Sequence, residues 1–330
     1  MINTTRFSSA RLSSGARRWA RPAALLVATV LAMLPLVAHN PFILTVATVI
    51  LLNAIGAVSL HLIIRTGHIS LAHAGFMGVG SYACVLSVIR LGAPPIVGVA
   101  IGAAAAALLA LLVGPIILRL TGKYFVLVTF LLGEIIRLVL VEWQDVTGGA
   151  NGLSEIPSLQ PAIQTPVAQY YVALVAALLC VGFCIRLLGS EIGRAIDATR
   201  EAERVTECTG VRVIRLKVGI FMLSSALVGV QGGLLAFFMH YIDPSSFGMT
   251  DSLNLVVMNV LGGMYNVVGP LLGTIFLVAL PELLRSYVEV QRVIFGIALI
   301  VVMAALPSGM VGLIAMLRSI APWHAREKRT

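Results

Sequence analysis

The sequence predicts an all-α membrane protein with about ten transmembrane helices, because long apolar stretches recur along its 330 residues. Hydrophobic residues make up 59% of the chain and charged residues only 11%, with a mean hydropathy of +0.99. Soluble domains carry about 25% charged residues. Several apolar runs are long enough to cross about 30 Å of hydrocarbon and contain no acidic or basic residue; these runs are 42–64, 96–118, 167–185 and 218–239.

Charged residues and helix breakers delimit the individual spans. We expect them at 23–38, 42–64, 69–89, 96–118, 124–141, 167–188, 218–239, 251–265, 267–286 and 291–306. The third, eighth and ninth are interrupted by glycines. On this assignment the chain is a basic N-terminal tail, 1–22, a membrane domain, 23–306, and a C-terminal tail, 307–330.

The basic residues indicate the orientation of these spans. If the first segment is cytoplasmic, nineteen of the 23 Lys and Arg residues fall on the cytoplasmic side, as the positive-inside rule requires. An even number of spans then leaves both termini in the cytoplasm. The net charge of +9 is confined to short loops and span ends, without a basic and aromatic face for nucleic acid. Membrane lipid is therefore expected as a partner and nucleic acid is not.

A glycine-rich segment, 67–82, combines small and polar residues at membrane depth. It is either a discontinuous helix lining a pathway or a tightly packed helix with no ligand role. On the first interpretation Ser70, His73 and Gly75 are candidate pathway residues. Nearby histidines do not predict a metal site, since no acid precedes Glu134.

Glu134 and Arg137 lie three residues apart inside a predicted span, so they can pair on one helix face. Ionisable groups at membrane depth are costly and usually face a bundle interior or a water-filled cavity. The pair is therefore a second candidate for the pathway, with a purely structural ion pair as the equal alternative.

A charged loop, 189–217, separates two apolar spans. The loop predicts one amphipathic helix over Arg194–Thr209, in which Asp197 can pair with Arg200 and Glu201 with Arg204 at spacing i, i+3. Gly210 then suits the left-handed position that ends a helix. Its mixed charge favours a protein groove over a lipid surface. The candidate docking residues are Arg194, Asp197, Glu201, Arg204, Glu207 and Gly210.

Four stretches together resemble one family, the LivM-type permeases of branched-chain amino-acid ABC importers. They are GHISLAHAGFMGVGSY (67–82), the stretch 120–153 ending in TGGANGL, the charged loop with the following span (193–237), and 241–285 with PSSF, LGG and GPLLG. His68 departs from the Gln usual in the family, and Ala72 from the usual Gly.

The resemblance implies a permease subunit of the bacterial inner membrane with no active site or bound cofactor of its own. It would form half of a pathway for leucine, isoleucine and valine with a LivH-like second permease, two cytoplasmic ATPase subunits and an extracytoplasmic solute-binding protein. The chain has no phosphate-binding Gly-x-x-x-x-Gly-Lys-Ser/Thr loop, so partner subunits would use the ATP and the 189–217 helix would be the coupling helix. A permease for urea or short amides, and an ion-coupled secondary transporter, remain alternatives.

Overall fold

A computed structural model of the chain describes residues 29–35, 40–157, 159, 165–285, 287–305 and 309–312. Helices account for the regular structure in these ranges, and the only pairing of β type is a bridge between Leu153 and Ile242. The predicted tails lie outside the described residues, except for a short helical piece at 309–312.

Six helices in the described ranges are long and apolar enough to cross a membrane. They are α2 (Pro41–Arg65), α3 (His73–Leu91), α4 (Pro95–Ile117), α5 (Lys123–Glu142), α7 (Pro166–Leu188) and α10 (Val213–Met239). Each matches a predicted span to within a few residues. All six consist of at least 19 residues, about 29 Å at 1.5 Å per residue.

The remaining predicted spans are not confirmed by helices of membrane length among the described residues. Where 251–265 and 267–286 were expected to cross, α11 (Met249–Gly262) and α12 (Val268–Leu283) have only 14 and 16 residues. Gly263, with a φ of 120°, ends α11 before it reaches membrane length. The last span appears as α13 (Val288–Ala305), whose apolar part is short. Among the described residues, length and composition therefore support six spans, and the predicted total of ten is not confirmed.

Only part of the first predicted span, 23–38, is described. Residues 29–35 are helical and lie against α7, where the Tyr170 and Tyr171 hydroxyls donate to the carbonyls of Leu31 and Ala32 at 2.7 and 3.1 Å. The rest of that span lies outside the described residues.

The glycine-rich segment is an irregular stretch followed by one continuous helix, rather than a helix broken along its length. Between α2 and α3 the backbone is non-helical over 66–72. Side chains satisfy amides of this stretch and of the first turn of α3: Thr129 Oγ1 accepts from the Leu71 N–H at 3.2 Å, and Ser252 Oγ accepts from the Ala74 N–H at 3.0 Å. These bonds replace the partners that a helix start lacks, so buried irregular backbone is tolerated there.

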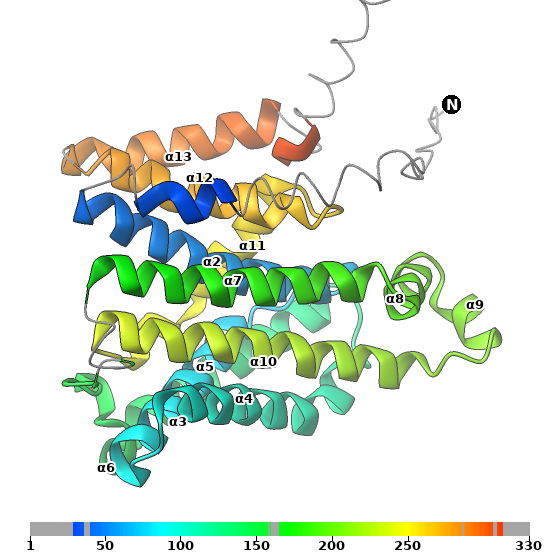
Figure 1. The fold of residues 1–330 in the computed structure, drawn as a ribbon. Coiled ribbons are helices and arrows are strands. Elements are labelled where there is room, and N and C mark those ends of the chain that lie inside the picture. The colour runs from blue at the N-terminus through cyan, green and yellow to red at the C-terminus, as the bar shows by residue number, and fades with distance from the viewer. Residues whose placement is uncertain are drawn as a thin grey trace, which may run out of the picture.

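Three helices, α3, α4 and α10, pack closely on one another side by side (Figure 1). Glycines allow this close approach. A Cβ added to Gly80 would lie 2.4 Å from the Gly229 Cα, and one added to Gly102 would lie 2.3 Å from the Gly80 carbonyl oxygen. Small residues at such interfaces let helix backbones pack directly on one another.

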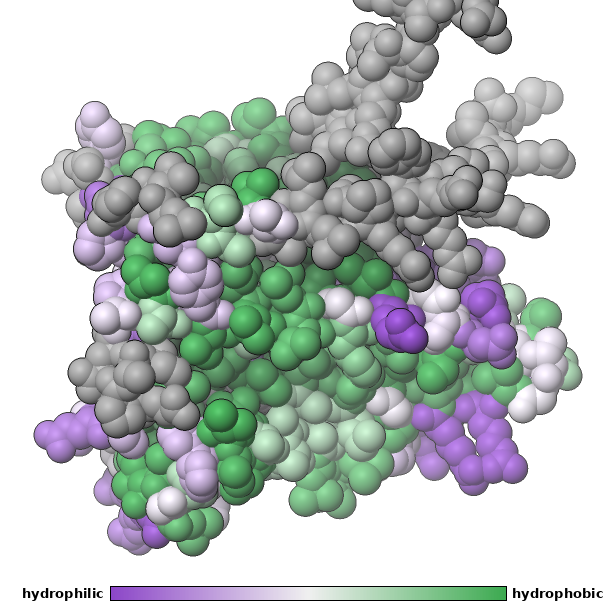
Figure 2. Space-filling view, in the orientation of Figure 1, coloured by the Kyte–Doolittle hydropathy of each residue, from purple (hydrophilic) through white to green (hydrophobic). Residues whose placement is uncertain are grey.

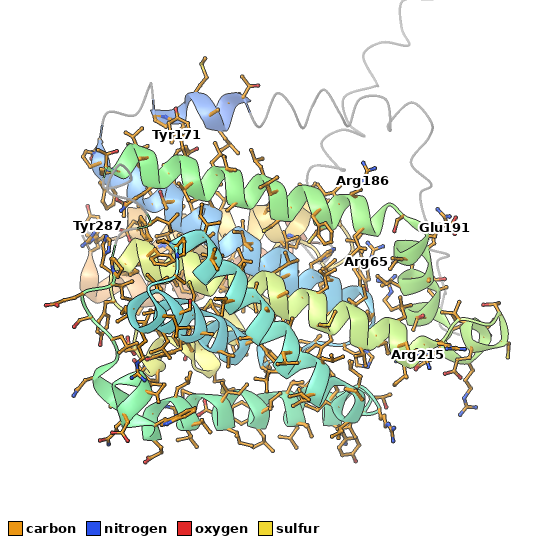
Figure 3. All side chains as sticks on the ribbon, turned by 60° about the horizontal axis from the view of Figure 1, so that its bottom comes forward. Arg65, Tyr171, Arg186, Glu191, Arg215 and Tyr287 are labelled. Carbon is orange, nitrogen blue, oxygen red and sulfur yellow. The ribbon has the colours of Figure 1, made fainter. Side chains whose placement is uncertain are left out.

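On the face shown in Figure 2, apolar side chains form a wide band, with polar residues gathered at its two ends. At one end lie α8 (Glu191–Glu201) and α9 (Glu203–Cys208), and Arg65, Arg186, Glu191 and Arg215 project there; we call this the loop end. Tyr171 and Tyr287 lie at the opposite, far end (Figure 3). The band fits the hydrocarbon of a membrane, with the helix axes running between two polar surfaces.

Candidate functional site: a charged loop and a membrane cavity

The charged loop forms two short helices instead of the single predicted helix Arg194–Thr209. Ala202 interrupts it between α8 and α9 with extended backbone angles (φ −154°, ψ 83°). Helix propensity alone did not reveal this break, since no Gly or Pro marks it. The predicted terminus is confirmed, because Gly210 follows α9 in the left-handed region at a φ of 88°.

The reason for the break is a buried charge at the start of α10. Lys217 is only 2% exposed, and its Nζ lies 2.7 Å from Glu203 Oε1, the first residue of α9. The break at Ala202 turns this carboxylate toward the ammonium group. A buried ammonium without a partner would be strongly destabilising, so tertiary electrostatics override the local preference for one helix.

His68 lies beside this ion pair, in the irregular segment between α2 and α3. Its ring packs edge-on against Phe125, with 4.6 Å between centroids. Burial lowers the pKa of His68, and the positive charge of Lys217 lowers it further. The imidazole is therefore neutral at pH 7.

A second cluster ties α8 to the rest of the loop end. Asp197 accepts from Arg65 at the end of α2, with 2.9 Å between Nε and Oδ1 and a second contact through Nη2. Arg65 Nη1 also donates to the Tyr265 carbonyl at 3.0 Å, and the Arg200 guanidinium lies 4.9 Å from the centre of the Tyr265 ring. We call Arg65, Asp197, Arg200 and Tyr265 the Arg65 cluster. It joins α8, α2 and the turn between α11 and α12.

The predicted docking residues therefore divide into two groups. Asp197 is paired with Arg65 and not with Arg200, which was the expected partner at i, i+3. Arg194, Glu201, Arg204 and Glu207 are exposed, and Val205 between them is 64% exposed. α9 lies at the extremity of the loop end, beyond the long helices (Figure 1), so these side chains are accessible to another protein.

The candidates from the glycine-rich segment lie in tight packing. His73 is fully buried, and its Nε2 lies 2.8 Å from Ser224 Oγ, whose hydroxyl donates to the Ser59 carbonyl. Ser70 is also fully buried, and a Cβ on Gly75 would lie 3.2 Å from the Gly133 Cα on α5. The structure thus brings these three residues into contacts between helices; whether they border the pathway stays a prediction.

Glu134 and Arg137 form the predicted ion pair on α5, with 2.9 Å between Nε and Oε2. Both side chains are less than a third exposed. Glu134 borders a small recess between Leu71 and Gly248. The pairing is confirmed, and its role in a pathway stays a prediction.

A cavity with a volume of about 430 Å³ lies between α2, α10, α11, α12 and α13. The sequence interpretation missed it, and the five predicted pathway residues do not line it. Five polar residues line the cavity: Asn53, Gln231, Ser246, Asp251 and Asn254. The sequence did contain a signal for this cavity, because Asn53 and Gln231 are uncharged amides that each interrupt an otherwise apolar span.

Comparisons with known proteins identify the family. Residues 42–303 match the family described as branched-chain amino acid transport system / permease component. The chain belongs to this permease family. It is 28% identical over 312 residues to the high-affinity branched-chain amino acid transport system permease protein LivM of Escherichia coli, covering 84% of this chain and 73% of that one.

Other relatives agree with this membership. A probable LivM of Methanocaldococcus jannaschii is 25% identical over 66% of this chain and 70% of its own. The LivH permease of Salmonella typhimurium is 28% identical over 46% of this chain and 49% of its own. No solved structure matches. The family and the apolar helices together make the chain a multi-pass membrane transport protein, and the relatives are permease subunits rather than enzymes.

Proposed function

We propose that this permease is one half of the translocation pathway of an ATP-driven importer for branched-chain amino acids. Its partners would be a LivH-like second permease, two cytoplasmic ATPase subunits and an extracytoplasmic solute-binding protein, with the loop end and both termini in the cytoplasm. The observation that carries this proposal is family membership over 42–303. The basic residues gathered at the loop end support the orientation.

The exposed part of the charged loop is the proposed contact with an ATPase subunit. Glu201, Arg204 and Glu207 surround the exposed apolar Val205, a combination typical of a helix that enters a groove on another protein. On the inner side, Asp197 and Arg65 join α8 to α2. A displacement of the loop by an ATPase would thereby reach the helices around the cavity.

The test is uptake of labelled leucine by cells that produce the chain together with a LivH-like permease, ATPase subunits and a solute-binding protein from the same organism. The double charge reversal Glu201→Lys/Glu207→Lys should abolish uptake and co-purification of the ATPase, while the amount of membrane-inserted chain is unchanged. Glu191→Lys is the matched control, since Glu191 is 93% exposed on the same loop but lies outside the proposed contact. Leucine uptake at the wild-type rate by the double variant would exclude this docking surface.

A parallel measurement separates the substrates. The wild-type assembly should take up leucine, isoleucine and valine and not urea. Uptake of urea alone would show that the amino-acid assignment is wrong.

A further inference from the structure

A row of residues on α2 leads from the cavity to the loop end. Asn53 lines the cavity on this helix, as Met258 does on α11. The next positions of α2 at a spacing of four are Ala57, His61 and Arg65, so the row stays on neighbouring turns of one side of the helix. It covers twelve residues, about 18 Å along the axis, and reaches the loop end at Arg65 (Figure 3). We call the contact of this row with α11 the seam.

Asn259 of α11 crosses the seam. Its Nδ2 donates to the Ala57 carbonyl of α2 at 2.9 Å and to the Leu255 carbonyl of its own helix at 2.9 Å. Its Oδ1 is buried and has no hydrogen-bond partner. Because Asn259 directly follows Met258, which lines the cavity, this amide stands where the cavity ends and close packing begins.

His61 is the second polar side chain of the seam. It is fully buried on α2, with Asn259 and Arg65 near its ring, and neither ring nitrogen has a hydrogen-bond partner. A buried polar atom without a partner costs free energy that an apolar side chain would avoid. Polar side chains retained at membrane depth commonly mark the route of a substrate or ion. The seam therefore has the chemistry of a route rather than of a sealed helix contact.

The two helices α11 and α12 form a tightly packed hairpin, whereas its polar contacts with α2 run through side chains. Within the hairpin, a Cβ added to Gly262 would lie 1.7 Å from the Gly269 carbonyl oxygen, so the two backbones touch. Across the seam, Asn259 and Arg65 make the polar contacts. Side chains change rotamer without disturbing a helix, so the hairpin separates from α2 more readily than its own two helices separate.

Arg65 closes the seam at the loop end. Its guanidinium donates to Asp197 of α8, and its Nη1 donates to the Tyr265 carbonyl in the hairpin turn at 3.0 Å. One side chain thus joins α2, the charged loop and the hairpin. Asp197 is 38% exposed, whereas Lys217 in the other ion pair of the loop is 2% exposed. Breaking the Arg65 pair therefore costs less than breaking the buried one.

We propose that the seam between α2 and the α11–α12 hairpin is the loop-end half of the transport path, held closed by Arg65. When the charged loop moves and Asp197 leaves Arg65, the hairpin separates from α2, and the solute passes from the cavity along His61 and Asn259. Both side chains donate and accept hydrogen bonds, so the seam suits a small polar or zwitterionic solute. The inference rests on the proposed function and adds to it the residues of the path and its closing group.

The experiment measures how fast a cysteine in the seam reacts with a membrane-impermeant methanethiosulfonate applied from the loop-end side. His61→Cys and Asn259→Cys are placed singly in a Cys208→Ser background, within the complete assembly in membrane vesicles. Labelling of the exposed native Cys208 in a parallel sample identifies vesicles with the loop end outside. Ser59→Cys is the matched control, because Ser59 is equally buried on α2 but its carbonyl accepts from Ser224 of α10.

All three cysteines should be unreactive at rest. Adding Asp197→Asn removes the charge that holds Arg65, and it should raise the reaction rates of His61→Cys and Asn259→Cys at least tenfold while Ser59→Cys stays unreactive. The exchange of Arg65→Asp with Asp197→Arg should return both rates to the resting value. With the native pair, the two seam cysteines should react only during ATP-driven uptake, and their modification should stop leucine uptake.

Unchanged rates in the Asp197→Asn background, or an equal rise for Ser59→Cys, would overturn the inference. Failure of the exchanged pair to lower the rates would overturn the role of Arg65. Two seam positions guard against a variant that does not insert. If both stay unreactive while the assembly takes up leucine, the inference fails and the proposed function stands. If the rates rise as expected but the assembly takes up urea alone, it is the proposed function that fails.

Discussion

Lys217 holds a positive charge where almost no water reaches it, and a single carboxylate from α9 neutralises it. Other ion pairs of the loop end are more exposed; Arg194 and Glu191 are 69% and 93% exposed. Exposed pairs contribute about 0–1 kcal/mol, whereas removing one partner of a buried pair costs about 3–5 kcal/mol. Burial therefore decides which charged residues of the loop hold its structure and which remain available to a partner.

We expect Glu203→Gln to lower the free energy of unfolding by about 3 kcal/mol, because it leaves the buried Lys217 ammonium without a counter-charge. The lower end of the range applies, since Glu203 itself is 41% exposed. Thermal unfolding in detergent measures the effect. Glu191→Gln is the control and should change stability by less than about 1 kcal/mol; similar effects of both variants would contradict the argument.

His68 makes stability depend on pH. Burial and the Lys217 charge lower its pKa in the folded protein, so the unfolded chain binds a proton at a higher pH than the folded one. The contribution of neutral His68 is complete above about pH 6.5 and is lost as the pH falls below it, by at most about 1.4 kcal/mol per pH unit. Thermal unfolding should therefore show a smaller loss between pH 7.5 and 5.5 in His68→Gln. An identical pH dependence of both proteins would exclude this role.

Among the elements, α3, α4 and α10 depend on glycines that face one another. The exposed apolar residues of α4, such as Leu112 and Ile116, face outward, and the small residues face the neighbours. Hydropathy does not distinguish these two faces, because both are apolar. Only the contact of Gly80 with Gly102 and Gly229 shows which side of each helix is inside.

Gly102→Ala should destabilise the protein by about 1–3 kcal/mol, the usual cost of overpacking, because the new Cβ would lie 2.3 Å from the Gly80 carbonyl oxygen. Gly182→Ala on α7 is a matched control, since no atom lies within 4 Å of its added Cβ. It should stabilise slightly through higher helix propensity. The measurement is the midpoint temperature of thermal unfolding in detergent. If only Gly182→Ala lowered this temperature, the conclusion that Gly102 lies in a tight helix contact and Gly182 in open space would be wrong.

On the scale of the whole molecule, the proposed docking surface and the cavity lie at different positions along the helix axes. The exposed docking residues lie at the loop end, and the cavity opens among residues toward the far end. The Arg65 cluster, with the turn between α11 and α12, belongs to the loop end and joins α8 to α2. If the loop end is cytoplasmic, an ATPase and a solute-binding protein would meet opposite ends of one helical body, as an importer requires.

Labelling with a membrane-impermeant maleimide tests this orientation. The exposed Cys208 should react only from the cytoplasmic side. In a Cys208→Ser background, Asn266→Cys should react from that same side and Asp145→Cys from the opposite one. Labelling of Asn266→Cys from outside would show that the turn between α11 and α12 does not lie on the same side of the membrane as Cys208.

Much of this protein follows from its sequence. Six spans, the ion pair of Glu134 with Arg137, the Gly210 terminus and the family all come from local patterns, because membrane insertion and helix ends depend on neighbouring residues. The break at Ala202, the Arg65 cluster and the cavity do not. They require groups far apart in the chain, such as Arg65 with Asp197 or Asn53 with Gln231, and only the packing of α2 against α8, α10 and α11 brings those groups together.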